Sequence, residues 1–487
     1  MTIHATDYQL LAEDQQPHQN DSNCKIDHEK PLDQPKEELE KVLFGKILLN
    51  RQISPTNFYV SFAYVTFLGF ILISNSTLEP EFISKVLNVD DENLGKATAN
   101  LYLWDYLIRL CFALMYGVMI DQMGRKFVLT IGLVLTSAGY FVIPLLSSSL
   151  FPAYYLAKSV YSSGIIALQM LPFAADYVHN STKGIMTCLT FGIGFMGGAI
   201  AAGVIKLLIA FSFSYRAIYW TLAIAIVIVG FLLRIGIKGG NTYYKTEKSD
   251  SAIDVSDTSN RWEEVKKAFR VVPWITIALI FGILGNTDLY IMTTGLIIWI
   301  KGLISPDDDP TVVATNYQVI FFGLSFLITA MLAFKVDKIP HMKVIFPVLI
   351  FSTFGFCFVP FITNAYGALT YIFFVIEGLA LPGILVYSTY LSARYNPPRI
   401  RGTISGISNG IGFIGAILIL TIGGYLHDFW RNDAGFLIYL GLLVLTLIIV
   451  TILYFTKIKH EKKHGNYNEL HNDQNHHNGT LDALHKA

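Results

Sequence analysis

The feature that most constrains this chain is a series of apolar runs, each about 20 residues long, separated by short connectors. A helix of that length crosses the hydrocarbon core of a bilayer. Helical structure is expected because lipid offers no partner to exposed backbone groups. We therefore predict an all-α membrane protein with 12 transmembrane helices. The runs lie near residues 56–76, 101–120, 127–146, 153–175, 184–209, 214–234, 273–299, 316–334, 344–362, 367–391, 402–425 and 435–456.

Composition agrees with this prediction and excludes several functions. Only 15% of the residues are charged, whereas about a quarter is usual in soluble proteins. The net charge is zero, so there is no electrostatic basis for binding nucleic acid. The four cysteines are scattered, and no nucleotide-binding loop or hydrolase motif occurs. We therefore expect no cofactor, no metal site and no enzymatic activity.

The Lys and Arg residues set the orientation, because basic connectors stay on the cytosolic side. The outer connectors are acidic, at Asp90–Glu92 and Asp307–Asp309. Both termini should therefore be cytosolic. We predict a disordered tail (1–52), a six-helix bundle (53–236), a cytosolic linker (237–270), a second six-helix bundle (271–456) and another disordered tail (457–487). The linker includes a stretch at 261–270 with the spacing of an amphipathic helix, expected to lie on the membrane surface.

A charged turn joins the second and third apolar runs. It reads G-x-x-x-D-x-x-G-R-K, with the named positions at Gly117, Asp121, Gly124, Arg125 and Lys126. The glycines permit close helix packing. The aspartate lies at the membrane edge and can exchange between cationic partners. Taken alone, the pattern also fits an ordinary basic turn between two membrane helices.

One stretch of the second half repeats a stretch of the first, with the same offset between all of its matching positions. Lys183-Gly184 followed by G-I-G-F-M-G matches Arg401-Gly402 followed by G-I-G-F-I-G. The charged turn has a weaker copy at Ala333-x-x-x-Asp337-Lys338. Two six-helix halves with parallel repeats are a known transporter architecture, with binding sites at the midplane between the halves.

Five ionisable residues lie inside the apolar runs, where charges are costly and mark functional sites. Asp105 and Arg109 are one helical turn apart and can pair. Lys158, Asp288 and Glu377 lie on the fourth, seventh and tenth runs. Lys158 and Glu377 occupy nearly equivalent repeat positions, so they could form a charge-balancing gate or contact a substrate. Asp288 has no basic residue nearby on its own helix, which favours a functional role.

The charged turn and the repeat resemble the major facilitator superfamily, over about residues 55–457. The resemblance implies two pseudo-symmetric six-helix halves, with the first, fourth, seventh and tenth helices lining a central cavity. It also implies that the charged turn, with Asp337 and Arg401, locks the inner side of the bundle. The stretch Pro398-x-x-Arg401-Gly402 also resembles the one before the eleventh helix of sugar-porter-like members. The helix motifs of proton antiporters, the glutamine pair of sugar transporters and the motif of peptide symporters are absent, so no subfamily and no substrate is indicated.

From these observations we predict a secondary transporter of a small organic solute, working by alternating access and coupled to protons. In this hypothesis Glu377 or Asp288 carries the proton, because burial favours the neutral acid, and Arg109 and Lys158 attract an anionic or zwitterionic solute. The alternative is a non-transporting receptor or scaffold with the same fold. A functional monomer is expected. The location is the plasma membrane or an endolysosomal or vacuolar membrane, the latter favoured by a dileucine-like signal at Asp7–Leu11.

Overall fold

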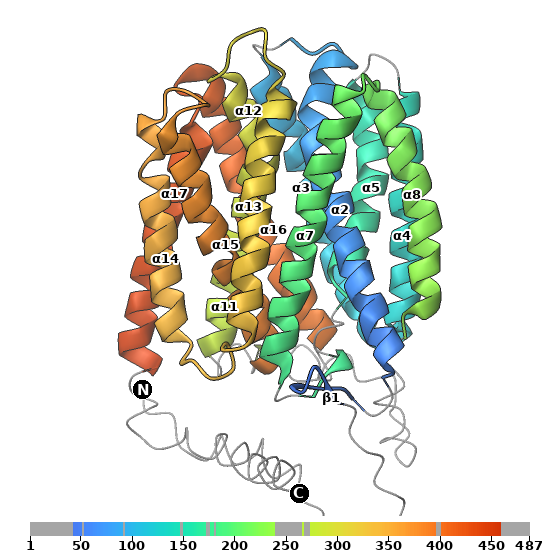
Figure 1. The fold of residues 1–487 in the computed structure, drawn as a ribbon, viewed down its shortest axis with the longest axis vertical. Coiled ribbons are helices and arrows are strands. Elements are labelled where there is room, and N and C mark those ends of the chain that lie inside the picture. The colour runs from blue at the N-terminus through green and yellow to red at the C-terminus, as the bar shows by residue number, and fades with distance from the viewer. Residues whose placement is uncertain are drawn as a thin grey trace, which may run out of the picture. The chain divides into compact units, whose positions relative to one another are not determined.

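The computed structural model describes residues 42–50, 53–90, 93–146, 150–171, 176–179, 182–238, 265–266, 273–395 and 401–458 (Figure 1). Within these ranges, eleven helical segments are long and apolar enough to cross a membrane. A further helix, α5, follows a π-turn at Leu150–Tyr154. The predicted architecture of two six-helix halves is confirmed. The N-terminal half holds α2 (Pro55–Lys85), α3 (Leu94–Met123), α4 (Arg125–Val142), α5 (Tyr155–Gln169), α7 (Lys183–Ala210) and α8 (Tyr215–Gly236).

The C-terminal half begins with a spanning segment in three parts. A π-turn, η5 (Ile291–Gly295), joins α11 (Pro273–Tyr290) to α12 (Leu296–Lys301). π-turns within α-helices are frequent at functional sites. The other helices of this half are α13 (Pro310–Ala333), α14 (Met342–Phe356), α15 (Ala368–Tyr395), α16 (Arg401–Phe429) and α17 (Ala434–Leu453).

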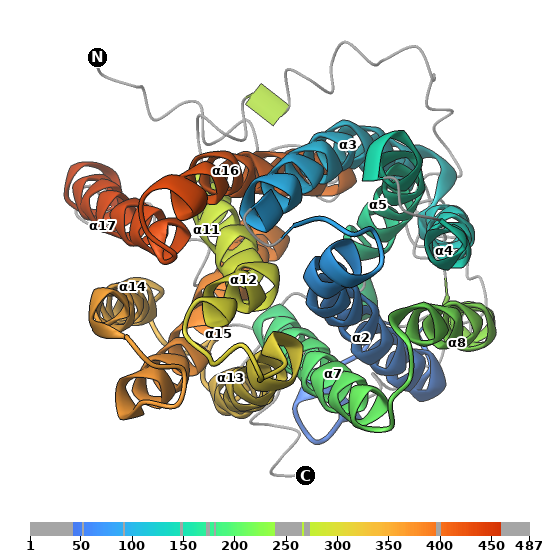
Figure 2. The same cartoon turned by 90° about the horizontal axis from the view of Figure 1, so that it is seen from above.

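Two pairs of long helices join the halves. In Figure 2, α3 lies beside α16 on one side of the bundle and α7 beside α13 on the other, and both pairs are in extensive contact. Helices α4, α8, α14 and α17 lie at the edges. The two pairs are equivalent in the repeat, because α3 corresponds to α13 and α7 corresponds to α16.

The repeated glycines explain why the repeat is visible in the sequence. A Cβ atom at Gly197 would collide with the Thr66 carbonyl of α2, and one at Gly415 with Ile283 of α11. These two glycines are equivalent positions of the repeat, and each allows its helix to pack closely against the first helix of its own half. Small residues serve this purpose in membrane bundles, where close backbone approach drives helix packing.

The first helix is longer than its apolar run indicated. The run ends near residue 76, but α2 continues to Lys85. Leu78 and Phe82 are buried and extend the packing face, while Glu79 and Glu81 interrupt the hydropathy pattern. The helix therefore carries two acidic residues that were assigned to a connector.

The prediction of a disordered tail up to residue 52 is wrong for residues 42–50. Val42–Leu43 and Ile47–Leu48 form an antiparallel hairpin, and Leu49 pairs with Val178 in the connector before α7. Ile47 and Leu49 are buried, so this segment contributes apolar surface that a polar tail lacks. The proposed amphipathic helix at 261–270 lies outside the described residues except for 265–266, and so does nearly all of the tail 457–487.

Candidate functional site

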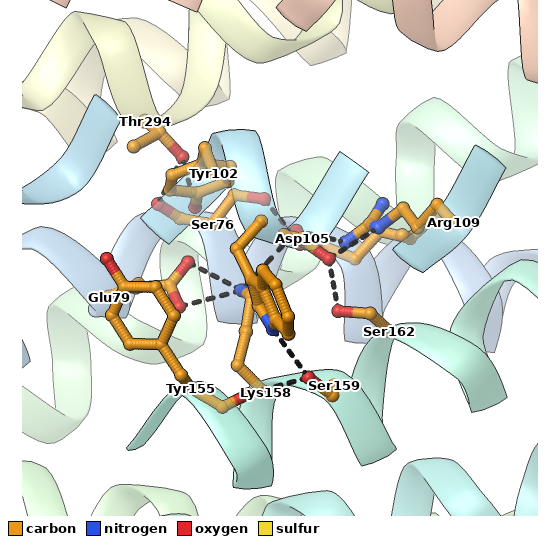
Figure 3. Close-up of polar contacts among 12 residues, drawn as sticks. Ser76, Glu79, Tyr102, Asp105, Arg109, Tyr155, Lys158, Ser159, Ser162 and Thr294 are labelled. Atoms are coloured by element: carbon orange, nitrogen blue, oxygen red, sulfur yellow. Dashed lines mark hydrogen bonds and ion pairs between the residues drawn. The ribbon is translucent and has the colours of Figure 1, made fainter. Parts of the chain in front are cut away.

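A buried chain of four alternating charges lies inside the N-terminal half (Figure 3). The Lys158 ammonium lies 2.7 Å from the Glu79 carboxylate and 3.7 Å from Asp105. Asp105 in turn receives two hydrogen bonds of 2.9 Å from the Arg109 guanidinium. We call these four residues the charge ladder. The pairing of Asp105 with Arg109, predicted from their spacing, is observed.

Neutral side chains complete the charge ladder. The Tyr154 hydroxyl donates to Glu79 at 2.9 Å, and the Ser162 hydroxyl donates to Asp105. Glu79, Asp105 and Lys158 are fully buried. Buried charges require this degree of pairing, since an isolated ion in a low-dielectric interior is strongly disfavoured.

Glu79 was not among the residues singled out from the sequence. It lies beyond the end of the first apolar run, so hydropathy placed it in a connector. The signal that could have found it is the spacing of Leu78 and Phe82, which continues the helical face of α2 on both sides of the glutamate. Glu79 also changes the role of Lys158. The Lys158–Glu377 pair considered from the sequence is not formed, because Lys158 is bound within its own half.

The C-terminal half contains a different arrangement, two buried carboxyl groups with no basic partner among the described residues. Asp288 of α11 and Glu377 of α15 are both fully buried. Neither oxygen of Asp288 has a hydrogen-bond partner, and only one oxygen of Glu377 does. That partner is the Ser352 hydroxyl of α14, at 2.8 Å. The two carboxyl groups lie close enough to interact with each other, and the Tyr439 hydroxyl of α17 is close to Asp288.

Two aspartates join the halves at the end of the bundle that we predicted to be cytosolic. Asp121, at the end of α3, accepts hydrogen bonds of 2.9 Å from the backbone amide and the hydroxyl of Thr403, in the first turn of α16. Asp337, after α13, accepts one of 3.1 Å from the Ile185 amide, in the first turn of α7. Ile185 and Thr403 are equivalent in the repeat, so each half supplies an acid to the same helix start of the other half. The positive end of a helix dipole favours such an acid.

The environment of Asp337 disfavours its ionised form. Burial raises the pKa of the Asp337 carboxyl, and this outweighs the lowering by Tyr390, Arg394 and the backbone amides. The Arg394 guanidinium is 3.9 Å from Asp337. Ionised Asp337 is therefore held at some cost in the closed state.

The other residues expected to lock the bundle lie at helix ends or at close contacts between helices. Arg125 forms a buried ion pair of 2.5 Å with Asp176, which lies before α7 and was not predicted. Gly124 separates α3 from α4 with a φ of 95°, a conformation that favours glycine. Gly117 lies against Gly406 of α16. Lys126 begins α4 beside Arg125, and Arg401 begins α16.

The opposite end of the seam, which we predicted to face outward, has its own contacts. Lys85, in the last turn of α2, is 3.0 Å from Asp309, which caps the start of α13 through Thr311 and Val312. Deeper in the bundle, the Tyr102 hydroxyl of α3 is 2.7 Å from the Thr294 hydroxyl in η5. Polar contacts therefore cross the seam at both ends of the bundle.

Comparisons with known proteins agree with this architecture. The family model of the Major Facilitator Superfamily matches residues 60–374 and 310–473. The magnetosome protein MamH of Paramagnetospirillum magneticum is 24% identical over 373 residues, which is 74% of this chain and 83% of MamH. The magnetosome protein MamZ of Magnetospirillum gryphiswaldense is 18% identical over 419 residues, 82% of this chain and 63% of MamZ.

Two solved structures share the fold. The proton:xylose symporter XylE superposes with a TM-score of 0.61 and 15% identity, over 83% of this chain and 96% of XylE. The human organic anion transporter MFSD10 superposes with a TM-score of 0.59 and 12% identity, over 81% of this chain and 99% of MFSD10. At these identities, the structural likeness concerns the fold alone.

Proposed function

We propose that this chain, which belongs to the major facilitator superfamily, is a secondary transporter that couples a proton to the movement of a small organic solute. Its family consists of transporters rather than enzymes, and its multi-pass fold is that of an integral membrane protein. Coupling to protons and the nature of the solute go beyond the family and the fold, and they are our proposal.

The pair formed by Asp288 and Glu377 carries the proposal. Both carboxyl groups are fully buried, and three of their four oxygens have no hydrogen-bond partner. In an apolar interior the charged form of such a group is strongly disfavoured, whereas the neutral acid can remain. A carboxyl group that is protonated when buried and ionised when wetted would take up a proton on one side and release it on the other.

The seam contacts supply the second requirement, which is alternate opening. The inner side depends on Asp121 and Asp337, and the outer side on Lys85 with Asp309. These contacts lie at opposite ends of the bundle, so one set can break while the other remains. Such rocking around a central site is how transporters with repeated halves are understood to work.

The test uses purified protein in liposomes with an imposed pH step, screened against sugars, amino acids, dipeptides and organic anions. We expect Asp288→Asn or Glu377→Gln to remove the pH dependence of uptake while leaving a slower, gradient-insensitive exchange. Asp433→Asn is the matched control, because Asp433 is an acid with a basic partner, Arg431, at 2.8 Å. A pH dependence that survives both variants would refute the assignment. Absence of uptake across the whole screen would favour the non-transporting alternative.

A further inference from the structure

The two cations of the charge ladder, Lys158 and Arg109, differ in how accessible they are to a solute. The Lys158 ammonium contacts both Glu79 oxygens at 2.7 Å and also approaches Asp105. The rings of Tyr102 and Tyr161 lie 5.0 and 5.1 Å from it. An ammonium group has three donors, and these contacts surround it. Lys158 is therefore closed to a solute in this conformation.

Arg109 is different. It donates to Asp105 through Nε and one Nη2 hydrogen, while Nη1 makes no hydrogen bond to any residue that the structure describes. The side chain is more than nine-tenths buried but retains 8% exposure, in contrast to the fully buried Lys158. A guanidinium carries five N–H donors in a planar fork. The Nη1 edge of the Arg109 guanidinium therefore has unused hydrogen-bond donors.

Two further polar atoms in the same region lack partners. Tyr106 and Tyr290 are 7% and 8% exposed, and within the described part of the chain neither hydroxyl makes a hydrogen bond. The Tyr106 ring lies 5.4 Å from the Arg109 guanidinium and 6.3 Å from the Tyr290 ring. None of these three donors is among the fully enclosed polar atoms without a partner, so each keeps some accessible surface. The three side chains are neighbours through the Tyr106 ring, so their unused donors offer a place for an acceptor that the protein itself does not supply.

The surrounding surface is aromatic and spans both halves. Tyr106 of α3 contacts Phe413 of α16 at 5.4 Å, and Tyr102 of α3 contacts Tyr290 of α11 at 5.0 Å between ring centroids. The paired rings belong to different halves, so they would separate if the halves parted. They would enclose an apolar or aromatic body beside the guanidinium.

The carboxylates of the charge ladder already have hydrogen-bond and ion-pair partners within the protein, and this limits the charge that a ligand can carry. Asp105 is bound by Arg109 and Ser162, and Glu79 by Lys158 and Tyr154. No acceptor is left there for an ammonium group. With two acids and two bases, the ladder is neutral overall, so it can take one added negative charge more readily than two.

We propose that Arg109, with the hydroxyls of Tyr106 and Tyr290, binds the carboxylate of a small monocarboxylic acid that has an apolar or aromatic body. This inference rests on the proposed transport function and specifies its solute. If the Asp288 and Glu377 pair carries one proton, the loaded carrier moves no net charge.

Binding can be measured on the purified full chain without any proton gradient, as ligand-induced thermal stabilisation at fixed pH. The probes share one body and differ in charge: 3-phenylpropionate, its neutral amide, 3-phenylpropylamine and phenylsuccinate. Acetate serves as the acid without the body. We expect 3-phenylpropionate to stabilise the protein most strongly. Equal stabilisation by the amide, or stronger stabilisation by the amine or the dianion, would overturn the proposal, and so would no effect from any probe.

Variants then locate the site. Arg109→Gln should weaken 3-phenylpropionate binding about tenfold or more, the usual effect of losing charge-assisted hydrogen bonds. Arg109→Lys should weaken it less. Arg216→Gln, at the exposed outer end of α8, is the matched control and should leave binding unchanged. Unaltered binding in Arg109→Gln would refute the assignment.

If Arg109→Gln does not fold, substitutions of the uncharged residues around Arg109 test the proposal. Tyr106→Phe and Tyr290→Phe should each weaken 3-phenylpropionate binding several-fold, and Phe413→Ala should weaken it more than it weakens acetate binding. No change in all three would overturn the proposal. Because no gradient is applied, acid binding through Arg109 would stand even if Asp288→Asn and Glu377→Gln disproved proton coupling.

Discussion

Replacing Asp121 by Asn tests the inner contact of the seam most directly. The substitution keeps the size of the side chain and one acceptor oxygen for Thr403, but it removes the negative charge from the start of α16. A helix terminus stabilises a nearby charge by about 0.3–1 kcal/mol, and by up to about 2 kcal/mol when partly buried. Hydrogen bonds to a charged group contribute about 1.5–3 kcal/mol, roughly twice the neutral case. The closed inner state should lose about 1–3 kcal/mol in total.

That loss corresponds to a shift of about 5- to 150-fold between closed and open inner states. The native cysteine Cys188 can be used to measure this shift. Cys188 of α7 is fully buried and lies near Tyr387 of α15, at the inner part of the seam. In a chain where the other three cysteines are replaced by serine, maleimide applied from the cytosolic side should label Cys188 faster in Asp121→Asn by about this factor.

Two control variants separate the charge from other effects. Thr403→Val removes only the hydroxyl donor and keeps the backbone amide, so its effect on labelling should be smaller. Lys85→Gln loosens the outer side and should not accelerate labelling. In transport assays Asp121→Asn should slow the conformational cycle while solute affinity stays nearly intact. An unchanged labelling rate, or a large loss of affinity with normal turnover, would refute the role that we give to Asp121.

Two further predictions concern the other acids. Glu79→Gln leaves the buried Lys158 ammonium without its main counter-ion, so stability should fall by up to about 3–5 kcal/mol. Thermal melts should show this loss. Glu81→Gln should cost less, because its partner Lys85 is 45% exposed to water and keeps Asp309 as a second counter-ion. For Asp337, burial raises its pKa in the closed state, and water should restore an ordinary value when the inner side opens. Closing then takes up a proton, so in the window between the ordinary Asp pKa and the raised value, lower pH should slow Cys188 labelling by more than the falling thiolate fraction does alone. Asp337→Asn should remove this additional slowing, and an identical pH profile in the variant would contradict the reasoning.

Hydropathy and the repeat determined much of this protein in advance. Apolar runs of membrane length can only become helices in lipid, and the glycines repeated at a constant offset fixed two equivalent halves. The pairing of Asp105 with Arg109 also followed from sequence, because residues one turn apart share a helix face. These features depend on local spacing, which a single chain displays directly.

Contacts between helices were decided only by the tertiary structure. From the sequence, Lys158 could have faced Glu377 or any other acid. Its actual partner, Glu79, is far away in the sequence, on a helix whose end was placed too early by the hydropathy pattern. Asp121 was expected to exchange between basic side chains, and the structure adds a contact across the seam, from its carboxylate to the start of α16. Which of two cations keeps a free donor is likewise a matter of packing. Such choices depend on how helices are rotated and how deeply they are inserted, and neither is encoded in the spacing of residues along one helix.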